Sequence, residues 1–538
     1  MDNINNSKFQ TRLPLFISLA IAGGIFIGAT MFGAKGSLIN IAKTSFKFCR
    51  ILDYIDNYYV DSVNVDELEV HAIRGMLKKL DPHTIYISPE EVAAAREPLI
   101  GNFEGIGIEF DIIKDTLIVV APISSGPSEK LGILSGDKII KVDGENIAGI
   151  GLTNNKVYKL LRGQKGSKVD VTILRGGNKK LLWFTITRDK IPTYSVDVSY
   201  MVDKITGYMR ITRFSAKTYD EFKGALSKLK SKGLKRLIID LRNNPGGYME
   251  HSIKIADEFI SGNKLIVYTD GKDPRYDTKY RANFTGLFET GPLIVLINEG
   301  SASASEIVAG ALQDNDRALI VGRRSFGKGF VQVPFTFEDD SEIRLTISRY
   351  YTPSGRCIQK PINNDYDFDL YNRYLHGEFY YADSIKFKDS TKFKTLKGRT
   401  VYGGGGIMPD IFVPRDTSYF SDYLSNLLNK NILTEYGLNY YDKHKQSLEN
   451  RTFDDFYINF RITDIMLDEF VKMASKMDIP FNEEEFEVSK SIIKNNLKME
   501  ITKWVWHNEG AVPVRLEKDE IFQAALKHFK EAERISRQ

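Results

Sequence analysis

Cysteine, histidine and tryptophan are scarce in this chain of 538 residues, which contains 2, 7 and 3 of them respectively. No CxxC or HExxH motif occurs, and no tract is rich in histidine. We therefore predict neither a structural nor a catalytic metal, and no cofactor. The two cysteines, Cys49 and Cys357, could pair, but a lone buried thiol is the expected state of each.

The chain also lacks an excess of charge of either sign, because 74 lysines and arginines face 70 acidic residues and leave a net charge of +4. This balance predicts no nucleic-acid partner. Hydrophobic residues make up 42% and charged residues 27%, which is ordinary for a globular protein. At about 100–200 residues per domain, the chain is long enough for several domains.

One long apolar run stands at the start of the chain, where residues 13–34 carry no charge. That length is enough to cross a bilayer as a helix. Because Lys8 and Arg12 precede the run, we predict a single-pass anchor in the cell inner membrane, with the rest of the chain on the periplasmic or extracytoplasmic side. A cleaved signal peptide ending in the small residues Gly33 and Ala34 is the alternative.

Composition and periodicity divide the chain into five predicted segments. Residues 1–36 hold the anchor or signal segment, 37–100 a helical region, 101–190 a β-rich unit, 191–415 an α/β domain and 416–538 a second helical region.

Three stretches predict structural features but contain no candidate catalytic or ligand-binding residues. An aromatic stripe from Phe46 to Tyr59 suits ordinary packing or, if exposed, self-association, so we predict a homo-oligomer formed through the helical regions. Residues 363–397 are polar and aromatic, and we expect a surface insertion there. The strongly charged stretch from Glu517 to Ser536 predicts one terminal helix in a packing or partner domain.

The β-rich unit opens with a glycine-flanked apolar run that leads into a strand. Signals for strands, two short helices and a closing hairpin follow, and in this order the unit resembles a PDZ domain, which binds a peptide C-terminus as an added strand. The resemblance implies that Gly105, Ile106, Gly107 and Ile108 receive the terminal carboxylate and the last side chain. The alternative is that these glycines only permit a tight entry into the strand.

Two turns of the α/β domain follow buried strands, and both are built from small residues. Arg242–Gly247 comes after the strand Leu234–Leu241, and Asn298–Glu306 comes after Pro292–Ile297. The second turn places serines at a helix start, where backbone N–H groups lack partners. Two such turns side by side can each donate one N–H to a developing oxyanion. The alternatives are purely structural glycine turns and a capping box formed by Ser303–Glu306.

A third loop supplies a lysine, Lys328, between two glycines. The stretch Gly322–Lys328 spells most of a phosphate-binding loop, but Gly329 stands where that motif needs serine or threonine. The alternating residues after it also predict a strand rather than a helix, which argues against nucleotide binding. Since no histidine lies near the serines, Lys328 is the candidate base for a serine nucleophile.

Several separate motifs, in order along the chain, resemble the carboxyl-terminal processing proteases, the tail-specific serine protease family with an inserted PDZ domain. These motifs are Asp240–Gly247, Asn298–Glu306, Ser325–Gly329 with Gln332, Tyr350–Arg356 and Gly406–Asp410. The resemblance implies an α/β fold with a crotonase-like protease core, an inserted PDZ domain and flanking helical regions. It also implies a serine endopeptidase that cleaves exported proteins near apolar C-terminal tails.

The same resemblance implies a role for each matching residue. Ser303 matches the nucleophile, Lys328 the general base and Gln332 the residue that orients the lysine. The main-chain N–H groups of Gly246 and Ala304 match the oxyanion donors. At the end of a PDZ helix, Arg162 is a candidate regulatory contact to the protease core.

The chemistry of a serine–lysine pair is consistent with these roles. A serine hydroxyl is a poor nucleophile until a base removes its proton, and lysine can act as that base only in its neutral form. Phe326 and Phe330 flank Lys328, and an amide at Gln332 can hydrogen-bond the amine without favouring its charged form. The rival interpretation is an exported PDZ scaffold with an inactive core, against which the intact Ser303, Lys328 and Gln332 argue.

Overall fold

The computed structural model describes residues 37–175, 181–362, 366–385 and 391–537, with side chains from residue 44 onward. The predicted membrane segment, residues 13–34, lies outside them. Among the helices that are described, none is both long enough and apolar enough to span a bilayer. Two compact units, Met1–Tyr86 and Ile87–Gln538, are distinguished by their internal contacts.

The first unit contains the helices α2 (Ser37–Tyr58) and α3 (Val65–Leu77). Large apolar side chains on α2 are exposed, among them Phe46 and Tyr58 at 66% and 79%. This exposure leaves the aromatic stripe available for self-association, which stays a prediction. Cys49 on α2 is also exposed and unpaired, so the expectation of a buried thiol is wrong there.

A six-stranded sheet forms the centre of the second unit, in the order β10-β11-β12-β15-β16-β21. Its strands are β10 (Val196–Met201), β11 (Thr206–Ile211), β12 (Arg236–Asp240), β15 (Leu293–Ile297), β16 (Leu319–Gly322) and β21 (Ile411–Phe412). The strands from β11 to β21 are parallel, and β10 pairs with β11 antiparallel. Parallel strands need crossover connections, and the apolar strand sequences fit burial on both faces.

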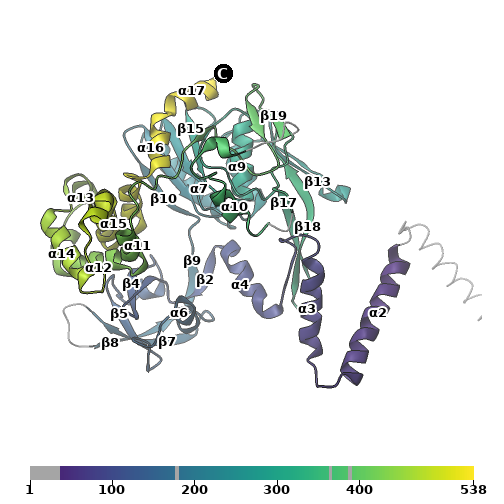
Figure 1. Cartoon of the computed structure of the whole chain (residues 1–538), viewed down its shortest axis with the longest axis horizontal. Helices are drawn as coiled ribbons and strands as arrows, with labels where there is room; N and C mark the ends of the chain where they lie inside the picture. Colours follow the sequence, from purple (N-terminus) through teal and green to yellow (C-terminus); the bar gives the residue numbers. More distant parts are fainter. Residues whose placement is uncertain (1–36, 176–180, 363–365, 386–390, 538) are drawn as a thin grey trace, which may run out of the picture. The chain divides into compact units, whose positions relative to one another are not determined.

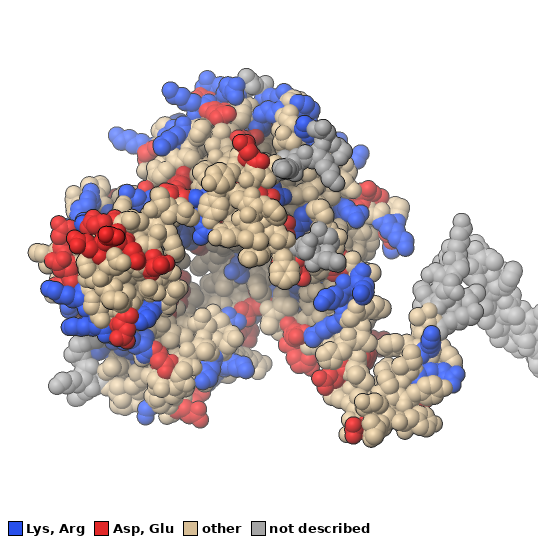
Figure 2. All heavy atoms as spheres, viewed as in Figure 1, with Lys and Arg blue, Asp and Glu red and all other residues tan. Residues whose placement is uncertain are grey.

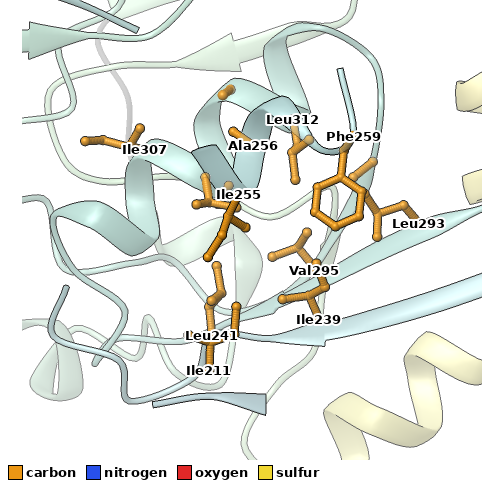
Figure 3. Close-up of a cluster of buried hydrophobic side chains, with 14 of the residues drawn as sticks. Ile211, Ile239, Leu241, Ile255, Ala256, Phe259, Leu293, Val295, Ile307 and Leu312 are labelled. Atoms are coloured by element: carbon orange, nitrogen blue, oxygen red, sulfur yellow. The ribbon is translucent and has the colours of Figure 1, made fainter. Parts of the chain in front are cut away.

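One face of this sheet is covered by α7 (Thr218–Ser231), α8 (Met249–Asp257) and α9 (Ala304–Asp314). Figure 3 shows Ile255, Phe259 and Leu312 from the helical layer packed against Ile239 and Val295 of the strands. A second sheet joins this core, in the order β17-β18-β13-β14. Its strands are β13 (Leu265–Gly271), β14 (Lys279–Arg281), β17 (Phe330–Thr336) and β18 (Glu342–Tyr351).

The opposite face of the central sheet is covered by the end of the chain. The helices α16 (Glu520–Lys527) and α17 (Phe529–Arg537), yellow in Figure 1, bury Phe522 and Phe529 in one cluster with Tyr208 of β11. The predicted single terminal helix is therefore wrong: two helices occur, and both pack on the central sheet. Helical periodicity shows that a face is apolar but not which surface covers it.

The inserted β-rich unit is a sheet in the order β3-β4-β5-β7-β8, with the short β6 (Glu145–Asn146) beside β5. Its elements are β3 (Ile108–Ile113), β4 (Thr116–Pro122), α5 (Pro127–Lys130), β5 (Lys138–Val142), α6 (Asn154–Leu161), β7 (Lys168–Leu174) and β8 (Leu181–Thr187). The strands β2 (Asn102–Gly105) and β9 (Asp189–Pro192) pair where the chain enters and leaves this unit. The helix α4 (Pro89–Ile100) precedes β2.

Five helices form the C-terminal helical region: α11 (Asp422–Asn429), α12 (Ile432–Glu449), α13 (Phe453–Asn459), α14 (Asp464–Ser475) and α15 (Glu483–Leu516). Their shared apolar core includes Ile113, Ile118 and Val120 from β3 and β4. In Figure 2, basic and acidic side chains are interspersed over the visible face, and acidic ones gather over these helices.

The predicted surface insertion, apart from its undescribed residues, contains α10 (Asp369–Leu375), the 3-10 turn Ala382–Ser384 and β19 (Lys392–Lys394), which pairs with β20 (Thr400–Tyr402). Its Arg373 is 3% exposed and donates to the carbonyl oxygens of Arg324 and Ser325 at 2.7 and 3.0 Å. The insertion therefore packs against the loop that leads to Lys328, which its polar sequence did not indicate.

Candidate active site

The predicted nucleophile, Ser303, lies between β15 and α9 and precedes the first residue of the helix. Its backbone is at φ 55° and ψ −113°, a region that residues other than glycine rarely adopt. Strained backbone of this kind is typical of functional turns and persists only when the surroundings hold it. Small neighbours, Ala302 and Ala304, leave room for the sharp turn.

The predicted base, Lys328, lies in the loop between β16 and β17 and is half-buried. Its Nζ donates to Oε1 of Gln332 at 3.0 Å. The pairing of β17 with β18 shifts register between Val331 and Gln332. Such irregularities re-aim side chains, so the contact does not depend on the regular strand that spacing alone would require.

Glu306, in the first turn of α9, joins the two loops through its carboxylate. Its Oε2 accepts from the N–H of Ser303 at 2.8 Å and from the N–H of Lys328 at 2.9 Å. Its Oε1 accepts from Ser325 Oγ and from the N–H of Gly327 at 2.5 and 2.7 Å. A capping box formed by Ser303–Glu306 was one alternative that the sequence allowed, and the structure contains that box. The same carboxylate also holds the loop Ser325–Gly329, which carries Lys328.

The carboxyl group of Glu306 has no exposure to solvent. Burial raises its pKa to about 7, against the opposing effect of hydrogen bonds from Ser325, Lys328, Gly327 and Ser303. Lys328 has no acidic neighbour along the chain, yet the fold places this carboxylate against its backbone.

Tyr350, at the end of β18, joins the same two loops from the carbonyl side. Its hydroxyl lies 3.1 Å from the carbonyl oxygen of Ser303 and 2.8 Å from that of Lys328, so its single proton is shared between these two acceptors. The side chain is 1% exposed, and burial raises the pKa of its hydroxyl well above the usual value. The hydroxyl therefore stays protonated and serves as a donor.

The predicted oxyanion donors, Gly246 and Ala304, meet beside the serine. A Cβ at Gly246, whose φ is +99°, would lie 2.8 Å from Cβ of Ser303 and 3.0 Å from N of Ala304, so only glycine fits. The N–H of Ala304 makes no hydrogen bond to any described residue. The N–H of Gly246 instead donates to Asn244 Oδ1 at 2.9 Å, a partner that the sequence did not reveal.

Ser303, Lys328, Gln332 and Tyr350 line one cavity of about 610 Å³. Its other walls come from the glycine turn, from β17 and β18, and from α4. The structure thus brings together the three side chains for which the sequence predicts a catalytic role. Among the described residues, no group of three His, Cys, Asp or Glu side chains is placed to hold a metal.

The predicted tail-binding residues lead into β3, which lines a second cavity of about 720 Å³ together with α6. The run Gly105–Ile108 is buried, and a Cβ at Gly107, whose φ is +74°, would lie 2.9 Å from Ile191. Of the four residues, Ile108 lines the cavity. β3 is an edge strand, so one of its sides is open to a further strand.

Arg162, the predicted contact to the protease core, has a different partner. Its Nη1 lies 2.7 and 2.8 Å from the two carboxylate oxygens of Glu97 on α4, and its guanidinium lies over the rings of Phe103 and Tyr158. The neighbouring Arg96 forms an ion pair with Glu342 of the core and lines the Ser303 cavity. In this structure Arg162 therefore contacts α4 rather than the core, and its regulatory role stays a prediction.

Comparison with known proteins decides the family. The profile of peptidase family S41 matches residues 205–368, and that of the PDZ domain matches 105–185. A carboxy-terminal-processing protease of Bartonella bacilliformis is 39% identical over 345 residues, covering 62% of this chain and 78% of the relative. The chain belongs to the carboxy-terminal processing protease family. This confirms the resemblance found in the sequence, with its PDZ domain.

A second curated relative agrees with this assignment. The carboxy-terminal processing protease CtpA of Bacillus subtilis is 34% identical over 359 residues, which is 65% of this chain and 76% of that protein. A solved photosystem II D1 C-terminal processing protease is 27% identical, with a TM-score of 0.35, and covers 68% of this chain and 92% of its own. Residues 423–507, in the C-terminal helical region, match a family of unknown function.

Within this family framework, Tyr350 offers a specific test of the loop geometry. Tyr350→Phe keeps the ring but removes the hydroxyl that joins the carbonyl groups of Ser303 and Lys328. We expect kcat for peptide cleavage to fall about fivefold with KM little changed, because the lost hydrogen bond is worth about 1 kcal/mol of positioning between the two loops. Tyr351→Phe, on the neighbouring residue, is the matched control and should keep the wild-type kcat. An unchanged kcat in Tyr350→Phe would contradict a positioning role.

Proposed function

We propose that this chain is an exported serine endopeptidase that cleaves proteins near their C-termini by a Ser303–Lys328 mechanism. One observation carries the proposal: the carboxylate of Glu306 and the hydroxyl of Tyr350 each join the backbones of Ser303 and Lys328 beside one cavity. Two loops that are separate in sequence are thereby held at a fixed spacing, as a nucleophile and its base require.

In the proposed reaction, neutral Lys328 takes the proton of the Ser303 hydroxyl as its oxygen attacks the scissile carbonyl carbon. The N–H of Ala304 donates to the resulting oxyanion. Gly246 adds a second donor once its N–H leaves Asn244, because in the present structure that hydrogen bond occupies it. Lys328 then gives its proton to the leaving amine, and water attacks the acyl-serine with Lys328 as base.

Gln332 positions the amine without favouring its charged form. Its Oε1 accepts from Nζ of Lys328, and an amide carries no charge. A carboxylate at this position would hold the lysine as an ammonium ion and prevent proton uptake. A neutral partner is thus the chemistry that this base requires.

The PDZ domain is proposed to bind the substrate's apolar C-terminal tail. A tail would add to the free edge of β3, with its carboxylate near the Gly105–Ile108 turn and its side chains in the 720 Å³ cavity. We propose export, with anchoring in the inner membrane, on the apolar run 13–34 and the basic residues before it. Self-association through the exposed residues of α2 is part of the same proposal.

Peptides that differ only at their last carboxyl group test the function. We expect a peptide with an apolar free C-terminus to be cleaved with at least about tenfold higher kcat/KM than its C-terminal amide, because the amide lacks the charge that the turn would receive. Ser303→Ala should cleave neither peptide. Equal rates for acid and amide would contradict tail recognition, and cleavage by Ser303→Ala would contradict the proposed nucleophile. An inactive scaffold would bind the peptide and cleave nothing.

A further inference from the structure

The two faces of β3 contact different domains. Ile108, Phe110 and Ile112 pack with the core of the PDZ domain, where the ring of Phe110 lies 5.8 Å from that of Tyr158 on α6. The residues between them face the other way, since strand side chains alternate. Ile113 lies in the core of the C-terminal helices, and Asp111 accepts from Lys503 Nζ on α15 at 2.8 Å.

The C-terminal helices are fixed to this side of the PDZ domain by apolar and charged contacts together. Ile118 and Val120 of β4 lie in the helical core. The ion pair of Lys114 with Glu435 on α12, at 2.6 Å, adds to the pair of Asp111 with Lys503. Contacts on both β3 and β4 hold the start of α12 beside the edge strand.

The cavity along β3 therefore has walls from two domains. Phe110 and Tyr158 line it on the side of α6, whereas Asn431 and Thr434, at the start of α12, line it on the side of the helical region. Glu109 and Asp111 line it as well. Of these two carboxylates, Asp111 has a lysine partner among the described residues, while exposed Glu109 has no ion pair there.

We propose that the C-terminal helical region forms the second wall of the tail-binding groove and selects alternate side chains of the bound tail. This rests on the proposed binding of tails to the PDZ domain. A tail added to β3 presents every second side chain to α6 and the others to Glu109, Asp111 and the start of α12. Glu109 favours lysine or arginine at those other positions, because Asp111 is already paired with Lys503. Phe110 and Tyr158 on the α6 side favour apolar side chains.

A position scan on the full-length Ser303→Ala protein tests this proposal, because that variant binds without cleaving. Ten-residue fluorescent peptides with an alanine background and a C-terminal valine carry one lysine, moved through the second to sixth positions from the end. We expect lysine to tighten binding about three- to tenfold at alternate positions and to have no such effect between them. Glutamate at the favoured positions should weaken binding.

Variants on each domain separate the possible outcomes. Glu109→Gln, an exposed substitution, should remove the lysine preference while the all-alanine peptide binds as before. Thr434→Arg and, independently, Asn431→Arg should change the preference at these tail positions from lysine to glutamate. Two separate arginine variants are used so that a folding defect in one of them does not decide the result. A lysine effect that is equal at all positions, or unchanged by Glu109→Gln and both arginine variants, would overturn the proposal. Absence of binding by every free tail would instead overturn tail recognition itself.

Discussion

Lys328→Ala should reduce kcat for peptide cleavage by at least about 10⁴-fold while the affinity for C-terminal tails stays unchanged. Removing a nucleophile or its base from an enzyme that uses them as a unit eliminates most of the rate acceleration. The small acceleration that remains comes from oxyanion stabilisation and substrate binding. The side chain lies in the cavity of Ser303, on a loop that is held by backbone contacts to Glu306 and Tyr350. Those contacts do not use the amine, so the loop should keep its position in the alanine variant.

Single-turnover cleavage and fluorescence anisotropy of a tail peptide measure the two quantities separately. Gln332→Ala is the graded control: it keeps the base but removes the 3.0 Å hydrogen bond to its amine, and a loss of about tenfold is expected. Wild-type turnover in Lys328→Ala would exclude lysine as the base. Loss of tail affinity together with kcat would indicate a folding defect rather than a chemical one.

Glu306→Gln should reduce kcat at least about 100-fold and also lower the folding stability. All four partners of the carboxylate act as donors: the N–H groups of Ser303, Gly327 and Lys328 and the hydroxyl of Ser325. A glutamine must turn its NH₂ group toward two of them, so one loop loses its partner and the spacing of Ser303 and Lys328 changes. The buried donors that face the NH₂ group lose their acceptor, and each such unsatisfied group costs the fold about 1–3 kcal/mol.

Circular dichroism melting and peptide cleavage of the same samples distinguish these effects. Ser325→Ala is the matched control, since it removes one donor and leaves both backbone contacts of Oε2, so it should lose less activity than Glu306→Gln. Full activity in Glu306→Gln would show that the carboxylate is only a helix cap.

The pH dependence follows from the pKa of Glu306, which burial raises from 4.5 to about 7. A raised pKa means that folding favours the protonated form, so this group's contribution to stability is complete below pH 4.5 and is lost as pH rises to about 7. The loss is on the order of 3 kcal/mol.

Activity should change with pH in the opposite direction, because the ionised carboxylate of Glu306 accepts hydrogen bonds from both loops. We expect kcat to rise through pH 7 while this contribution to stability falls. Glu306→Gln should lose the falling component of stability, and an identical stability profile in both proteins would contradict the assignment.

The features that could be predicted from the sequence are those that depend on local patterns along the chain. The PDZ domain could be predicted because glycines, strands and a hairpin follow in a characteristic order, and the protease family because several motifs recur in sequence. Ser303, Lys328 and Gln332 came from that resemblance, and the fold places all three on one cavity. Glu306 was predicted only as a cap, since spacing along a helix does not show that the lysine loop returns to the same carboxylate.

The features that the sequence did not predict are contacts between segments that lie far apart along the chain. Nothing near Tyr350 in the sequence indicates that its hydroxyl reaches both Ser303 and Lys328. The charged stretch Glu517–Ser536 predicted one helix in a packing or partner domain, but not that two helices cover the central sheet. The contact of Arg162 with Glu97 on α4 was missed for the same reason, because the sequence does not show which carboxylate the fold brings near a charged side chain.

The most direct test of the account is the mass of the intact protein after treatment with a fluorophosphonate, which reacts with an activated serine. The account predicts one adduct, located on Ser303 by peptide mapping, in the wild type, none in Ser303→Ala, and labelling at least about 100-fold slower in Lys328→Ala. Equal labelling of Ser303 in the wild type and in Lys328→Ala, or an adduct on Ser301 or Ser305 instead, would contradict it.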